Sequence, residues 1–330
     1  MPGTARLGLQ TRRNMRIGVN IGGTPPFEEI LATVRAVAEA GLDGVYFNQV
    51  LGWDVLTLAA LAGRTAPGLE VGTAVVPTYS RHPVALAQQA LTVAAATGGR
   101  LVLGVGPSHA AVVEQVYGVP AERPVRHLRE YLAALLPLLR GESIEFVGET
   151  LKSTAGVDVP GVEAPPVLLS ALRPAMLELA GSTVDGIVTV WTTAEFIATN
   201  IAPPLTAAAR AANRPQPRIA AIVTAAAAAE PVRVSRQVAE RTAAASNLAN
   251  YRALLELQAL TGVHETAVIG TETAVAAGLR AYASAGVTDL LISLAGDAQD
   301  RARTLALLAD LRRDLAAPGH HQGSGPEMSK

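Results

Sequence analysis

Eight short apolar runs alternate with amphipathic helical patterns through most of this 330-residue sequence. The runs are RIGVN, GVYF, LEVGTAVV, RLVLGVG, APPVLLSA, DGIVTV, RIAAIVTA and VTDLLISL. Strands that alternate with helices pair in parallel, because each return to the sheet needs a crossover. Nearly continuous apolar runs are typical of strands covered on both faces. The pattern favours a closed (β/α)8 TIM barrel; an open doubly wound sheet is the alternative, although no GxGxxG follows the first run.

The two ends of the chain lack this alternation. Residues 1–14 precede a second methionine, Met15, and we expect them to form an N-terminal extension. Residues 317–330 are Gly, Pro and polar residues without periodicity, and we expect a disordered tail there. The barrel domain is therefore expected over residues 15–316, with insertions after its fourth and seventh strands. The segment ESIEFVGETLK, after the fourth strand, alternates as a small hairpin does.

Composition excludes several classes of function. The 27 basic and 28 acidic residues nearly balance, so nothing favours nucleic acid or an anionic membrane face as a partner. No apolar run is long enough to cross a bilayer, and the N-terminus lacks the apolar region of a signal peptide, so we expect a cytoplasmic protein. The absence of cysteine excludes thiolate chemistry. Lysines occur only at 152 and 330, which disfavours Schiff-base chemistry, and scattered histidines predict no metal site.

Polar residues stand where several predicted strands end. In a (β/α)8 barrel the active site lies at the C-terminal ends of the strands. Asn48 and Gln49 directly follow the second run, and Trp53 comes four residues after Gln49. The fourth run ends in Gly106 and is followed by His109. These residues are interpreted as lining a ligand cavity, and ordinary turns or loop residues are the alternative.

The end of the fifth run is typical of an anion site. The strand ends at Ser170, a short turn carries Arg173, and Pro174 is well placed as the first residue of a helix. Free backbone amides at that helix start, together with the helix dipole and the arginine, would suit a phosphate. A well-capped helix with an exposed arginine is the alternative interpretation.

These segments together resemble the luciferase-like flavin and deazaflavin oxidoreductases, in particular the branch that uses coenzyme F420. The most specific part runs from Gly72 to His109, with an Arg-x-Pro helix opening, Gly-Gly-Arg and Leu-Gly-Val-Gly in order. Segments 117–132 and 267–292 are also similar to the family. The resemblance extends from Met15 to about residue 315, and it implies a luciferase-like barrel.

The resemblance also implies a cofactor site. In this family the third strand often ends in a non-prolyl cis peptide that supports the tricyclic ring, and the matching bond is Ala74–Val75. The turn from Ala171 to Met176 resembles the phosphate-binding turn, and Asn48 to Trp53 is similar to the end of the family's second strand. The residues implied to bind the cofactor are Asn48, Gln49, Trp53, Ala74, Val75, Gly106, Ser170, Ala171, Arg173, Pro174 and Ala175.

One departure from the family bears on the reaction. Deazaflavin dehydrogenases of sugar phosphates carry Asp-His where this chain has Asn48 and Gln49, and an amide cannot take a proton at neutral pH. His109 stands where that group often has Glu, and a histidine near its reference pKa can deliver a proton. The expected activity is therefore reduction, with hydride passing from C5 of the reduced deazaflavin to an electron-poor C=C or C=N bond. His109, Gln49 and Asn48 are the catalytic candidates.

Two other functions stay open. The same fold supports FMN-dependent monooxygenases, so FMN is the alternative cofactor. A non-catalytic barrel that binds a flavin-like ligand is a further alternative. A small organic molecule is the expected substrate, and a homodimer is implied by the resemblance alone.

Overall fold

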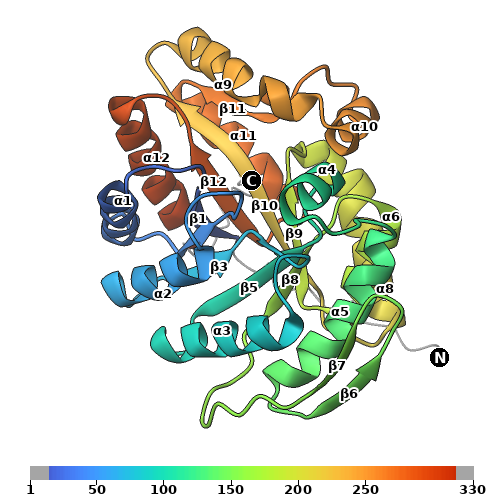
Figure 1. Ribbon diagram of the computed structural model, residues 1–330. Helices are drawn as coiled ribbons and strands as arrows, with labels where there is room; N and C mark the ends of the chain where they lie inside the picture. Colours follow the sequence, from blue (N-terminus) through green and yellow to red (C-terminus); the bar gives the residue numbers. More distant parts are fainter. Residues whose placement is uncertain (1–14, 317–330) are drawn as a thin grey trace, which may run out of the picture.

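The computed structural model describes residues 15–316 (Figure 1). The expected N-terminal extension, residues 1–14, and the expected tail, residues 317–330, lie outside the described residues. Within the described part, parallel strands close into a barrel with helices around it, so the predicted fold is confirmed and the open sheet is excluded.

The barrel closes because its first strand pairs on both sides, with β2 and with β12. From β2 to β9 the barrel strands pair in the order in which they occur in the sequence. β9 then pairs with β10, and β10 pairs with β12. All these pairings are parallel. The barrel strands are β1 (Arg16–Ile21), β2 (Gly44–Phe47), β3 (Glu70–Thr73), β5 (Leu101–Gly106), β8 (Val167–Ser170), β9 (Gly186–Val190), β10 (Arg218–Ala227) and β12 (Asp289–Leu294).

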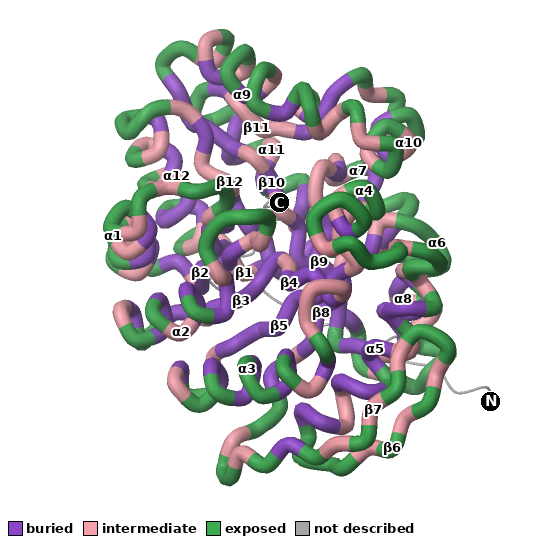
Figure 2. Tube along the Cα trace, in the orientation of Figure 1, coloured by how far each residue is buried: buried purple, intermediate pink, exposed green. Residues whose placement is uncertain are grey.

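Helices cover the outside of the barrel, and their buried faces are purple in Figure 2. Proline stands at the first position of α3 and α6, as the sequence predicted. The Asp54 carboxylate caps α2 by accepting from the Thr57 amide at 2.8 Å. The main helices are α1 (Phe27–Glu39), α2 (Val55–Thr65), α3 (Pro83–Ala96), α5 (Pro124–Leu139), α6 (Pro174–Thr183), α8 (Ala202–Ala211), α11 (Glu272–Ser284) and α12 (Ala298–Ala316).

Extra elements follow three of the strands. After β5 come α4 (Ala110–Val112), a π-helical turn (Val113–Tyr117) and, beyond α5, the hairpin of β6 (Ile144–Val147) and β7 (Lys152–Ala155), which the sequence predicted. After β9 come α7 (Ala194–Phe196) and a second π-helical turn (Ile197–Ile201). After β10 come α9 (Pro231–Ser246), α10 (Ala249–Leu257), a 3₁₀ turn (Val263–Thr266) and β11 (Val268–Gly270). The three-residue β11 was not predicted, because it is too short to show a period.

The inside of the barrel is packed. Side chains from six of the barrel strands (β2, β5, β8, β9, β10 and β12) form a buried inner cluster that includes Tyr46, Val102, Leu168, Val188 and Leu291. Beneath this cluster, at the N-terminal ends of the strands, Arg218 pairs with Glu70 and Asp289 at 2.8 and 2.7 Å. The barrel is thus a closed core with charged groups at its base, and the open end for a ligand is the opposite one.

The third barrel strand is interrupted. β3 ends at Thr73, and a short strand, β4 (Val76–Pro77), continues the pairing with β5. Between them the Ala74–Val75 peptide bond is cis, as the family resemblance predicted. In the described part of the chain, no helix is both long and apolar enough to pass through a membrane.

Candidate functional site

The floor of the barrel mouth is apolar. Val75 is partly exposed and packs on the inner cluster from above. A Cβ atom added at Gly106 would lie 2.9 Å from Val75 Cγ2 and 2.9 Å from Ser170 Cβ. Only glycine therefore leaves room for these two side chains to approach each other here. Val75, Gly106 and Ser170, from three strand ends, form one surface on which a flat molecule could rest.

Two buried amide oxygens at the ends of β1 and β2 have no partner. The Asn20 side-chain amide donates to Ser293 Oγ at 3.0 Å, and its own Oδ1 accepts no hydrogen bond in the described structure. Asn48 Oδ1 is likewise buried and unpartnered, and it lies against Gly22, where a Cβ would stand only 2.5 Å away. A buried acceptor without a partner is costly. Neither oxygen finds a donor among residues 15–316.

Gln49 is held by an arginine that follows β4. Arg81 Nη1 donates to Gln49 Oε1 at 3.1 Å, and Arg81 Nη2 forms a short ion pair with Asp54, the cap of α2. A guanidinium has only donors, so the Gln49 oxygen must face Arg81 and its NH₂ group must face away. Arg81 and His82 stand just before α3. His82 caps α3, accepting from the Val84 amide at 3.3 Å, whereas Arg81 positions Gln49.

Trp53 forms the outer wall beside this pair. Its indole N–H donates to Pro25 O at 3.0 Å, and its ring packs at a tilt on Phe27 with centroids 5.6 Å apart. The side chain is 43% exposed. It borders a hollow of about 310 Å³ that Asn48 and Gly23 also line. Trp53, which follows β2, is therefore held against the loop after β1 and encloses the Asn48 side of the mouth.

His109 belongs to an aromatic cluster on the other side. Its ring meets Tyr251 edge-on at 4.8 Å, and Tyr251 meets Trp191 at 4.2 Å. Gln258 Nε2 donates to the Trp191 carbonyl at 3.1 Å, which ties the cluster to α10. Burial lowers the pKa of His109 from its ordinary value and raises the pKa of Tyr251 to about 12. His109 is therefore neutral at neutral pH, where the sequence suggested a pKa near the reference value.

The turn after β8 offers free donors. Arg173 caps α6 through its backbone and is exposed, with no ion-pair partner within residues 15–316. The backbone amides of Leu172, Arg173 and Ala175 donate to no acceptor in that range. Ala171 is buried, and its amide donates to Val188 O at 3.2 Å, which anchors the turn to β9. Free amides at a helix start beside an unpaired arginine can donate hydrogen bonds to an anion.

The structure therefore brings the predicted residues into three groups around one mouth. Asn48, Gln49 and Trp53 form one edge, and Ala74, Val75, Gly106 and Ser170 form the floor. Arg173, Pro174 and Ala175 form the anion turn. Sequence reasoning missed Tyr251, because an isolated tyrosine in an amphipathic helix carries no sign of a site. The role of Arg81 was also missed, since its partner lies 32 positions away.

The fold defines a class, the (β/α)8 barrels, whose ligand sites lie at the C-terminal ends of the strands. Residues 9–289 match the family described as luciferase-like monooxygenase, and the chain belongs to this family.

Curated relatives match about half of the chain. A Mycobacterium tuberculosis protein named "putative coenzyme F420-dependent oxidoreductase" is 31% identical over 192 residues, which cover 52% of this chain and 54% of that protein. The 5,10-methylenetetrahydromethanopterin reductase of Methanolobus tindarius is 26% identical over 174 residues, covering 52% of this chain and 53% of that protein. The matches thus span about half the length of these relatives.

Solved structures match nearly the whole chain in fold. The coenzyme F420 dependent tetrahydromethanopterin reductase of Methanopyrus kandleri has a TM-score of 0.72 at 18% identity, with 90% of this chain and 97% of that chain covered. A monooxygenase of Streptomyces bottropensis has a TM-score of 0.75 at 20% identity, with 92% and 100% covered. At these identities the likeness shows the shared barrel alone.

Proposed function

We propose that this protein is an oxidoreductase that binds coenzyme F420 in the barrel mouth. It would transfer hydride between the deazaflavin C5 and an electron-poor C=C or C=N bond of a small organic substrate. One observation supports the cofactor most directly: an apolar floor, two unsatisfied buried acceptors and a free anion turn surround the same mouth. A flat ring with N–H groups and a phosphorylated tail needs these three features. Relatives named for coenzyme F420 support the choice of cofactor.

The chain's residues divide the work of binding. Val75, with Ala74 and Gly106, would support one face of the ring, and Trp53 would close the edge beside Asn48. Asn48 Oδ1 would accept from the ring, and the Gln49 NH₂ group would donate to it or to the substrate. Ser170, Ala171, Arg173, Pro174 and Ala175 would hold the phosphate. When bound, the deazaflavin supplies the hydride chemistry, and the protein supplies position and a dry face.

The proton in this proposal comes from water that His109 hydrogen-bonds. A neutral imidazole is a weak acid, so His109 with a lowered pKa suits holding and orienting water better than direct donation. Asn48 and Gln49 cannot take a proton from an alcohol. The direction of reduction rests on this absence of a base on the β2 side.

An FMN-dependent monooxygenase is the second candidate function. The family description favours a monooxygenase, and the apolar floor together with the anion turn would suit FMN as well. The two cofactors differ in chemistry, since reduced FMN reacts readily with oxygen and the deazaflavin does not.

A titration decides between the two cofactors. Purified protein is titrated separately with F420 and with FMN, and we expect micromolar binding of F420. Reduced F420 and candidate enones or imines are then added, and oxidised cofactor is followed near 420 nm. Tighter binding of FMN with turnover that consumes oxygen would favour the monooxygenase, and binding without any turnover would favour a non-catalytic barrel.

The anion turn is tested with a matched pair of arginines. Arg173→Ala is expected to weaken F420 binding about tenfold or more, because a charge-assisted phosphate contact contributes on the order of 1.5–3 kcal/mol. Arg64→Ala is the control, since Arg64 is exposed in the last turn of α2, at the other end of the barrel. Equal affinities of the two variants would contradict the placement of the phosphate.

A further inference from the structure

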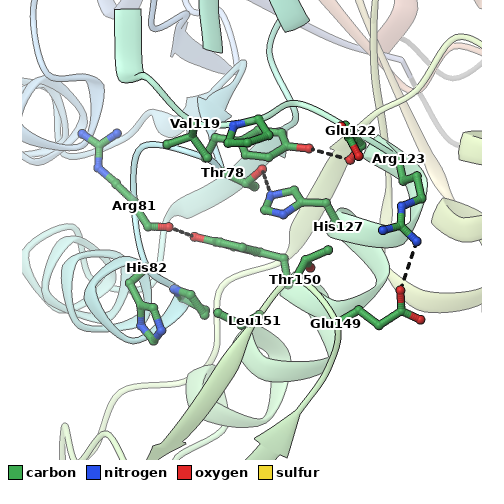
Figure 3. Close-up of a pocket in the computed structure, with 14 residues that line it drawn as sticks. Thr78, Arg81, His82, Val119, Glu122, Arg123, His127, Glu149, Thr150 and Leu151 are labelled. Carbon is green, nitrogen blue, oxygen red and sulfur yellow. Dashed lines mark hydrogen bonds and ion pairs between the residues drawn. The ribbon is translucent and has the colours of Figure 1, made fainter. Parts of the chain in front are cut away.

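A second cavity of about 480 Å³ lies outside the barrel mouth (Figure 3). Its walls come from the loop after β4, the loop before α5 and the turn between β6 and β7. None of the residues proposed to bind the cofactor lines it. Its volume falls in the range typical of small-molecule sites, about 300–1,000 Å³.

The inner wall of this cavity is built from three rings. Tyr79 stacks on His127 with centroids 3.8 Å apart and planes 9° from parallel, and Tyr131 lies 5.7 Å from His127. The Tyr131 hydroxyl donates to the Arg81 carbonyl at 2.8 Å, which fixes that ring. Val119 and Leu151 add apolar surface. Flat faces with apolar edges suit a planar ligand.

His127 brings an unused polar atom to this wall. The side chain is only 9% exposed. Its Nε2 lies 3.0 Å from Thr78 Oγ1, which also lies 3.3 Å from the Gly106 carbonyl. The other ring nitrogen, Nδ1, faces away from Thr78 (Figure 3) and has no hydrogen-bond partner among residues 15–316. Because Nδ1 has no partner among the described residues and is not among the fully buried polar atoms, a ligand in the cavity can reach it.

The arginines around this cavity are paired, and Glu122, which has no ion-pair partner among residues 15–316, is exposed to solvent. Arg123 Nη1 lies 3.0 Å from Glu149 Oε2 at the rim, and Arg126 pairs with the other oxygen of Glu149. The Arg81 guanidinium points away from the cavity, toward Gln49 and Asp54 (Figure 3). Burial lowers the pKa of His127 to about 4, so its ring is neutral at pH 7. The interior therefore attracts neither an anion nor a cation strongly.

We propose that this cavity is a second binding site, which takes a small uncharged aromatic molecule bearing a hydroxyl or N–H group. The ring of the ligand packs against Tyr79, His127 and Tyr131, and its polar group bonds to His127 Nδ1. The site is separate from the barrel mouth and does not depend on the function proposed for the mouth.

The proposal is tested with 4-fluorophenol as the probe, which is uncharged at pH 7. Its ¹⁹F NMR line is followed while the protein is titrated, and we expect broadening and a shift with sub-millimolar affinity. The charged analogues 4-fluorobenzoate and 4-fluorobenzylammonium are expected to bind at least tenfold more weakly. Equal or tighter binding of either ion would overturn the proposed ligand class, and no binding of the phenol at millimolar concentration would overturn the site.

Variants locate the bound probe. Val119→Trp fills the cavity and is expected to abolish binding, whereas Val116→Trp is the matched control, because both valines are partly exposed, at 38% and 46%, and only Val119 lines the cavity. His127→Phe keeps a ring but removes Nδ1, and a loss of about tenfold is expected. Undiminished binding to Val119→Trp would contradict the location. Displacement of the probe by F420 would instead assign the cavity to the cofactor site.

Discussion

At the scale of single residues, Arg81 orients the side-chain amide of Gln49, although the two residues are far apart in the sequence. Arg81 donates to the amide oxygen at 3.1 Å and is itself held by Asp54. The amide is therefore oriented before any ligand arrives, with its NH₂ group as the free end. An oriented donor binds a ligand at lower entropic cost than a freely rotating one.

The orientation of Gln49 is tested by replacing its donor. Gln49→Glu keeps an acceptor for Arg81 and turns the free end into a second acceptor. We expect F420 affinity to fall at least tenfold in fluorescence titrations, since a donor is lost and an acceptor faces the ring. Gln49→Met, which removes both groups, should lose less. An unchanged affinity of Gln49→Glu would show that this amide does not meet the cofactor.

Because His127 is buried, we expect the free energy of unfolding to depend on pH. The pKa of His127 is lowered by burial to about 4, and the nearby Glu130 raises it only in part. Between about pH 6.5 and pH 4 the unfolded chain binds a proton at this histidine and the folded chain does not. The free energy of unfolding should therefore fall as the pH is lowered through this window, by on the order of 2 kcal/mol.

Urea denaturation at pH 7, 5.5 and 4.5 measures this effect. His127→Phe removes the titrating group and should flatten the fall between pH 6.5 and 4 by the same amount. Parallel pH curves for the two proteins would contradict a neutral buried His127.

At the scale of elements, the turn between β6 and β7 is attached to α5 by the Glu130 carboxylate, in addition to the exposed Arg126–Glu149 ion pair. Glu130 accepts from the amides of Glu149 and Thr150 at 3.1 and 2.7 Å, and from the Thr150 hydroxyl at 2.7 Å. The turn of the hairpin forms one wall of the second cavity. The shape of that cavity therefore depends on this attachment.

Removing the carboxylate should free the turn. Glu130→Ala is expected to speed hydrogen exchange of the Thr150 amide at least tenfold, because three hydrogen bonds are lost. Glu145→Ala is the matched control, since Glu145 is exposed on β6 and its side chain makes no hydrogen bond to residues 15–316. The idea fails if both variants exchange at the wild-type rate.

At the scale of the whole molecule, the two ends of the barrel differ in kind. The base is closed by Arg218, which pairs with Glu70 and with Asp289, a residue only 2% exposed. The mouth instead keeps unpaired acceptors and free amides. Polar groups satisfied by the protein stabilise the fold, whereas those left unsatisfied are available to a ligand.

Removing the ion pairs of Arg218 at the N-terminal end of the barrel should destabilise the entire barrel. Arg218→Met leaves the buried Asp289 with Arg16 as its remaining ion-pair partner, and we expect the free energy of unfolding to fall by about 3 kcal/mol. Arg313→Met is the control, because its pair with Asp310 is exposed and should contribute well under 1 kcal/mol. Thermal denaturation of both variants measures the difference, and similar midpoints would refute a structural role for the base.

The barrel, and the end of it proposed to carry the site, follow from local patterns in the sequence. Apolar runs of strand length, helical periods and prolines at helix starts are local signals, and each acts over only a few residues. Parallel connectivity then places every strand end at one face. For this reason Asn48, Gly106 and Ser170 could be assigned to one mouth before any coordinates were known, and the family resemblance located the cis bond at Ala74–Val75.

The side-chain contacts, in contrast, depend on the folding of the whole chain. Arg81 reaches Gln49, and His127 reaches Thr78 across 49 positions. The Tyr251 ring packs against His109 from a helix beyond β10. These contacts depend on the paths of irregular loops, which have no period in the sequence. The second cavity exists only where three such loops converge, and a cavity is a property of the packed chain that no local pattern of residues contains.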